Sequence, residues 1–184
     1  MVDDWTYLIC YNRLNFYIHM TITLNKKKYE NTVLYLCQKL GGEVRGKKKL
    51  AKLLYFADFD FYEKYQKSIT GDTYRALPMG PFPITLEEMT SEMTKNKEIE
   101  IDHVPVREGY NATEIYKSLV KPDMSVFSSD ETNMLDRIIV KYGHLNGKQL
   151  EDLSHGEAPY VGTRPGNEIY YELSYYRDTD FNDI

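Results

Sequence analysis

The chain has few cysteines, no long apolar run and no excess of positive charge, and each absence excludes a class of protein. Two cysteines in 184 residues, Cys10 and Cys37, are too few for a disulfide framework. A reduced, cytoplasmic protein is therefore expected. Asp3 and Asp4 stand where a signal peptide carries positive charge, and no apolar stretch is long enough to span a bilayer. We expect neither secretion nor a membrane partner.

What is present fits one ordinary globular domain. Hydrophobic residues make up 42% of the chain and charged residues 28%, which allows a sizeable core at this length. Seventeen tyrosines supply large rings whose hydroxyl groups tolerate water, a composition that suits a semi-buried core or a protein interface. Met20 comes just before the first clear helix. Residues 1–19 are therefore a candidate extension outside the core, and residues 20–184 are expected to form a single domain.

Apolar periodicity and capping signals predict the helices. In residues 26–40 apolar side chains recur every three or four residues, and Gly41-Gly42 then ends the pattern. Residues 47–65 are apolar around much of the helix circumference, which predicts a central buried helix. Capping-box spacing at Thr85, Ser128 and Asn146, with Pro83 suited to a first turn, favours three further helices. These are expected over residues 83–95, 128–142 and 146–155.

The remaining segments are predicted to be mostly extended. Residues 68–77 look like extended chain with a turn at Gly71-Asp72, and prolines punctuate the loop that follows. Residues 98–107 and 113–120 are expected to form a hairpin around Gly109-Tyr110-Asn111. Pro105 places the first of these strands at a sheet edge. Residues 169–176 are apolar at nearly every position, and periodicity leaves strand and helix both open.

Charge is distributed unevenly along the chain. Residues 26–67 hold eleven basic and five acidic side chains, a net of +6, whereas residues 123–184 hold five basic and twelve acidic ones, a net of −7. The basic segment could face nucleic acid or an acidic partner, or it could be a solvated surface. The helix pair of residues 31–40 and 47–65 could form a helix-turn-helix, but the second helix is too apolar to leave a groove-reading face exposed.

The residue pattern indicates neither a catalytic site nor a metal-binding site. Asp58 and Asp60 diverge by roughly 200° on a helix and form no acid/base pair, so Asp58 is expected to bond to nearby backbone or to a tyrosine. Glu151 and His155 have metal-like spacing, but no second histidine stands at ligand spacing, which favours a structural histidine at a helix end. Ser154 lacks a nucleophile-elbow glycine frame and an orienting acid. We expect no catalytic residue, metal or cofactor, and no enzyme.

Five short motifs occur in a fixed order along the chain. They are Leu50–Asp58, Gly71–Pro81, the helix before Tyr142-Gly143, Leu153–Pro159 and Arg164–Ile169. Their order and spacing over residues 29–177 resemble the Panacea antitoxin domain, also called SocA-like. Two departures concern the partner surface: Tyr160 stands where members often have Trp, and Gly80-Pro81 is followed by Phe82-Pro83 rather than by Val.

The resemblance implies an α+β fold, a mainly helical single domain with a small antiparallel β element. It also implies an antitoxin that neutralises a co-encoded toxin by direct protein contact. One branch of the family instead resembles a proteolytic adaptor that delivers its toxin to a AAA+ protease. Such genes are typical of bacterial, archaeal and phage mobile elements, prophages included. A DNA-binding transcriptional regulator of a mobile-element operon is the alternative.

The loop around Gly80-Pro81 is the expected partner-binding surface. It carries apolar side chains that a soluble loop does not need, and aromatic residues and methionine are enriched at interfaces. The predicted partner-binding residues are Tyr74, Leu77, Met79, Pro81 and Phe82.

Overall fold

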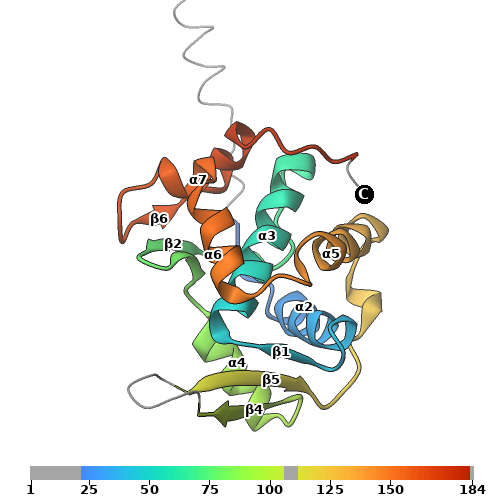
Figure 1. Cartoon of the computed structure of the whole chain (residues 1–184). Helices are drawn as coiled ribbons and strands as arrows, with labels where there is room; N and C mark the ends of the chain where they lie inside the picture. Colours follow the sequence, from blue (N-terminus) through green and yellow to red (C-terminus); the bar gives the residue numbers. More distant parts are fainter. Residues whose placement is uncertain (1–21, 106–111, 183–184) are drawn as a thin grey trace, which may run out of the picture.

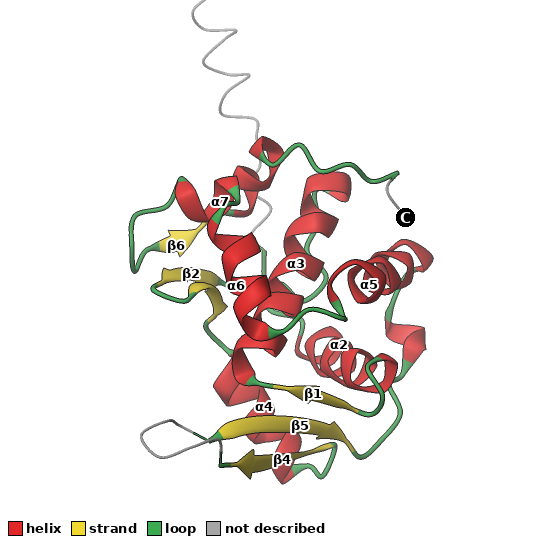
Figure 2. Cartoon of the chain, viewed as in Figure 1, coloured by secondary structure: helices red, strands yellow, loops and turns green. Residues whose placement is uncertain are grey.

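The computed structural model of the chain describes residues 22–105 and 112–182 (Figure 1). Helices predominate, and two small antiparallel sheets of three strands each accompany them (Figure 2). The expected fold class, α+β and mainly helical with a small antiparallel β element, is therefore confirmed. The candidate extension, residues 1–19, and the hairpin turn at Gly109-Tyr110-Asn111 lie outside the described residues.

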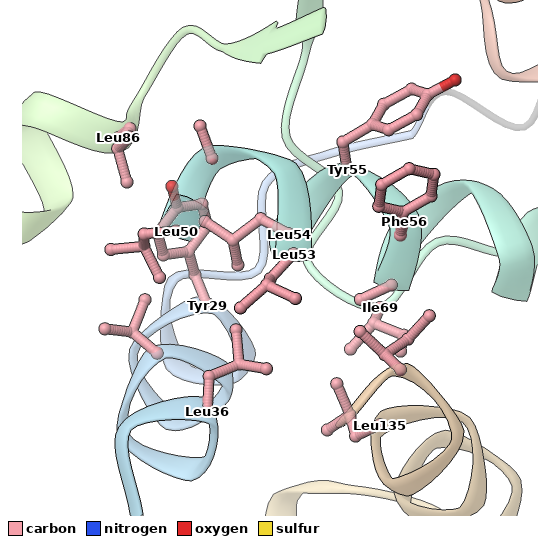
Figure 3. Packing of buried hydrophobic residues seen from close by; sticks show 14 of the residues in the cluster. Tyr29, Leu36, Leu50, Leu53, Leu54, Tyr55, Phe56, Ile69, Leu86 and Leu135 are labelled. Atoms are coloured by element: carbon pink, nitrogen blue, oxygen red, sulfur yellow. The ribbon is translucent and has the colours of Figure 1, made fainter. Parts of the chain in front are cut away.

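Helix α3 is the centre of the core, as its apolar composition predicts. It spans Lys47–Tyr65, and every residue from 50 to 61 is buried. Helices α2 (Lys26–Lys39), α5 (Ser129–Tyr142) and α6 (Gly147–His155) pack around it (Figure 1). Figure 3 shows leucine and aromatic side chains of α3 meeting those of its neighbours.

Four further helical elements complete the described part of the fold. They are α4 (Leu86–Lys95), the 3-10 turn η1 (Met124–Val126), α7 (Ala158–Val161) and the 3-10 helix η2 (Tyr171–Tyr176). The capping boxes at Ser128 and Asn146 form as predicted, each with reciprocal bonds between the cap and the third helical residue.

The first sheet has the strand order β1-β5-β4 and contains the predicted hairpin. Strand β4 (Ile99–Val104) pairs with β5 (Thr113–Ser118) and is an edge strand, as Pro105 predicted. Strand β1 (Glu43–Arg45) pairs with β5 on its other side. Strand β1 was not predicted, because three residues are too few for an alternating pattern.

The second sheet, in the order β3-β2-β6, is built from very short strands: β2 (Tyr74–Leu77), β3 (Gly80–Pro83) and β6 (Glu168–Ile169). Side chains alternate between its two faces. Tyr74, Pro83 and Ile169 lie opposite one another and are buried toward the core. The outer face carries the next row, formed by Arg75, Phe82 and Glu168.

Three expectations need correction or completion. The helix predicted from Pro83 begins only at Leu86, because Pro83 is the last residue of β3, an edge strand that tolerates proline. Thr85 is the N-cap residue of α4, as its spacing predicts, but it makes no capping hydrogen bond because its hydroxyl donates to Asp72 Oδ2 at 2.7 Å. The undecided tail turns out to be β6 followed by the 3-10 helix η2.

Truncating the centre of α3 tests this account of the core. Leu54 has no exposed surface, so Leu54→Ala is expected to lower the free energy of unfolding by about 2–5 kcal/mol through lost burial and a residual cavity. Urea denaturation measures the change. The matched control is Val140→Ala on α5, where the side chain is 61% exposed and the expected change is within about 0.5 kcal/mol. Equal stability of both variants would show that α3 is not the core helix.

Candidate functional site

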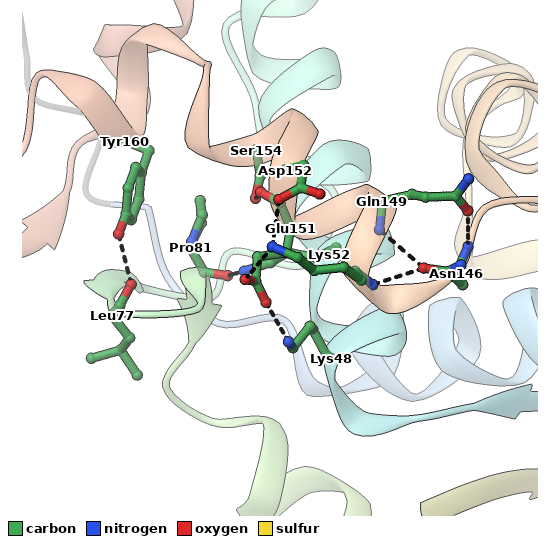
Figure 4. Close-up of polar contacts among 11 residues, drawn as sticks. Lys48, Lys52, Leu77, Pro81, Asn146, Gln149, Glu151, Asp152, Ser154 and Tyr160 are labelled. Atoms are coloured by element: carbon green, nitrogen blue, oxygen red, sulfur yellow. Dashed lines mark hydrogen bonds and ion pairs between the residues drawn. The ribbon is translucent and has the colours of Figure 1, made fainter. Parts of the chain in front are cut away.

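The turn between β2 and β3 is held in place from both ends by side chains of helices (Figure 4). At one end the ammonium group of Lys52, on α3, donates to the carbonyl oxygen of Pro81 at 2.6 Å. At the other end the hydroxyl of Tyr160, on α7, donates to the carbonyl oxygen of Leu77 at 2.9 Å. We call residues 77–81 together with Lys52, Ser154 and Tyr160 the hairpin site.

Glycine at position 80 allows the turn to approach these helices closely. Gly80 has φ of 88°, in the left-handed region that disfavours other residues. A Cβ atom there would lie 2.7 Å from Lys52 Nζ and 2.8 Å from Ser154 Oγ. The turn therefore rests directly on α3 and α6 through its backbone.

Lys52, which fixes one end of this turn, is unusual for a lysine because it is almost completely buried, with 1% of its surface exposed. Burial lowers the pKa of its ammonium group from 10.5 to about 7, although the charge of Glu151 acts in the opposite direction. The hydrogen bond to Pro81 gives the buried amine a partner. Without that partner the cost of desolvating the amine would be uncompensated.

Four of the five predicted partner-binding residues are divided between the two faces of the second sheet, and Met79 lies in the turn between β2 and β3. Tyr74 has no exposed surface and Pro81 is buried, so both belong to the core. Leu77 and Phe82 are half-buried, and Met79 at the tip of the turn is 60% exposed. Only these last three are available at the surface, and their role in partner binding stays a prediction.

Sequence reasoning missed the two residues that hold the turn. Lys52 lies between Ala51 and Leu53 inside the most apolar helix of the chain, and a cation in that setting signals a buried, bonded amine. Tyr160 was visible only as a departure from the family pattern. Its ring stacks against that of His155, with 4.6 Å between the centroids.

The uneven charge distribution is largely balanced within the domain. Lysines of the basic segment reach carboxylates supplied by later parts of the chain. These pairs are Lys26–Glu92, Lys27–Asp123, Lys28–Glu131, Lys39–Asp136, Lys47–Glu87, Lys47–Glu114 and Lys48–Glu151. This pairing reduces the positive surface potential that would attract the phosphate groups of a nucleic acid. The segment between α2 and α3 is also strand β1, and α3 is too buried to enter a groove.

The other polar residues that were weighed as catalytic or metal-binding candidates make structural contacts instead. The Glu151 carboxylate forms ion pairs with Lys48 and Lys148, and the buried Ser154 hydroxyl donates to the Glu151 carbonyl oxygen at 2.9 Å. Asp58 bonds to nearby backbone and to a tyrosine, as predicted. Among residues 22–105 and 112–182, no group of three potential metal ligands comes together. No helix in this same part of the chain has the length and apolar character needed to cross a membrane.

The buried amine predicts a specific dependence of stability on pH. Because the pKa of Lys52 is lower in the folded than in the unfolded chain, the unfolded chain binds more protons between about pH 7 and pH 10.5. The contribution of Lys52 to stability therefore rises with pH in this window, by at most about 1.4 kcal/mol per pH unit. In urea titrations from pH 7 to pH 10, the stability of the parent relative to Lys52→Met should rise with pH. Parallel curves would contradict the burial of this amine.

We compared the chain with protein-family models, with curated proteins and with solved structures. Residues 50–160, more than half of the chain, match the family described as antitoxin SocA-like, Panacea domain. The match includes Lys52, the whole β2–β3 hairpin and Tyr160, and it is narrower than the resemblance over residues 29–177. No curated protein and no solved structure matched the chain. The chain belongs to the antitoxin SocA-like, Panacea domain family.

Proposed function

We propose that this protein is an antitoxin that neutralises a co-encoded toxin by direct, stoichiometric contact, and that the hairpin site forms part of the contact surface. The observation that carries the proposal is the position of Met79. Its side chain is 60% exposed at the tip of a turn whose two ends are fixed by Lys52 and Tyr160. Methionine is enriched at interfaces and adapts its shape to a partner.

A fixed turn favours binding because little conformational entropy remains to be lost on association. The elements that hold it add further apolar surface. Leu153 on α6 and Val161 on α7 are 47% and 70% exposed, and α6 contacts both α7 and β3. Membership of an antitoxin family supports a toxin as the partner in general. The proposed activity is binding and requires no catalytic residue.

Co-expression with the product of the neighbouring gene, in a host that this product poisons, tests the proposal. The parent chain is expected to restore growth and to co-purify with the toxin. If growth recovers only in a host that retains its AAA+ proteases, the protein acts as a proteolytic adaptor. If growth recovers with no physical association, direct neutralisation is wrong and a transcriptional regulator is favoured.

A charge at the tip of the turn tests the contact surface itself. Met79→Asp is expected to abolish both growth recovery and co-purification, because a carboxylate would be desolvated at an apolar contact. Its melting temperature should stay within a few degrees of the parent, since the side chain is exposed. Val140→Asp, at a similarly exposed position on α5, is the matched control and should retain both activities. Full activity of Met79→Asp would remove the hairpin site from the interface.

A further inference from the structure

A cleft of about 580 Å³ lies beside the hairpin site, between the outer face of β2 and the segment that leads into β6. Its lining includes Arg75, Arg164, Asn167, Glu168, Tyr170 and Leu173. Arg75 is on the outer face of β2, the face that also carries Leu77. Arg75 of the cleft is thus two residues from Leu77 of the hairpin site, on the same face of β2.

The two arginines of the cleft differ from the other arginines of the described residues. Arg45, Arg137 and Arg177 each form an ion pair with a carboxylate. Arg75 and Arg164 are both exposed, and within residues 22–105 and 112–182 neither guanidinium forms an ion pair or a hydrogen bond. Two cations with unused donors therefore line one cavity.

The backbone holds these two arginines in the same neighbourhood. The amide of Gly166 donates to the Ala76 carbonyl oxygen at 2.7 Å, and the amide of Ala76 donates to the Asn167 carbonyl oxygen at 2.9 Å. The turn that follows Arg164 is thereby tied to the residue that follows Arg75. Their proximity is a property of the fold and not of flexible side chains alone.

The guanidinium groups and the apolar wall of the cleft indicate which class of ligand it can bind. A guanidinium presents paired donors that match a carboxylate or a phosphate group. Tyr170, 62% exposed, and half-buried Leu173 add an apolar wall, which suits the neighbourhood of a protein side chain. Glu168 lies opposite Arg75 in the β2–β6 pair and lines the same cleft, so a ligand with one negative charge meets less repulsion there than a polyanion such as nucleic acid. The net charge of −5 on the chain also disfavours a polyanion.

We propose that this cleft binds a carboxylate side chain of the toxin, with Arg75 and Arg164 as the donors and Tyr170 as the adjacent apolar contact. The inference rests on the proposed function for the identity of the partner. It adds a charge-selective site to the apolar contact at Met79, so that the partner must present an acidic residue beside an apolar one.

The first experiment is independent of the toxin. Two immobilised heptapeptide libraries, randomised except for a central Glu in one and a central Gln in the other, are used to retain the purified full-length protein. The parent should prefer the Glu library, and Arg75→Gln/Arg164→Gln should lose that preference. Lys95→Gln/Lys121→Gln removes the same charge from two exposed lysines without ion pairs in the described chain and should behave as the parent. Equal retention on both libraries, or a preference that survives in the arginine variant, would overturn the proposal.

A phosphoserine library and a single-stranded oligonucleotide distinguish other anions. Stronger arginine-dependent retention on either than on the Glu library would overturn the carboxylate assignment.

In the second experiment, the arginine variant should bind the neighbouring gene's product about tenfold more weakly than the parent, at an unchanged melting temperature. If the parent forms the complex and the variant binds equally well, the cleft is excluded while the antitoxin function stands. If the parent forms no complex, the proposed function fails and the peptide libraries still decide the chemistry of the cleft.

Discussion

Three charged side chains buried on α3 fix the segments of the chain that have little regular structure of their own. Lys52 holds the end of the β2–β3 turn through Pro81. Asp58 accepts hydrogen bonds from the amides of Ile69 and Thr70 and from the hydroxyl of Tyr74, all between 2.7 and 2.8 Å. Asp60 pairs with Arg177 at 2.7 Å and so holds the segment after η2. The central helix is therefore both the apolar core and the anchor for the second sheet and the C-terminal segment.

These anchors are strong constraints because the groups involved cannot easily be left unpaired. Burial raises the pKa of Asp58, while the hydrogen bonds from Thr70 and Tyr74 act to lower it. Removing one partner of a buried charge typically costs about 3–5 kcal/mol, so local opening of these segments is unfavourable. The energetic cost of burying charge thus produces fixed geometry in short strands and turns. Fixed geometry at an exposed apolar tip is what a binding surface needs.

The outer face of β2 lies between the two proposed contact features. Leu77 and Arg75 project from the outer face of β2, which leads on one side to the Met79 tip and on the other to the cleft containing Arg164. Most of the basic charge of residues 26–67 is neutralised within the domain, as the Lys28–Glu131 and Lys39–Asp136 pairs illustrate. The unpaired arginines of the cleft are therefore informative about the partner, whereas the total charge of a segment is not.

The sequence by itself determined the long helices, the β4–β5 hairpin with its edge strand, and the family, because periodicity, capping boxes and motif order are local signals. Tertiary structure alone decided that Pro83 ends a strand, that Tyr74 and Pro81 face the core, that β1 pairs with β5 and that β6 pairs with β2. These strands are too short to carry a period. It also decided that Lys52 is buried against the turn and that Arg75 and Arg164 line one cleft. The physical reason is that these contacts join residues tens of positions apart, and their partners can be identified only when the chain is folded.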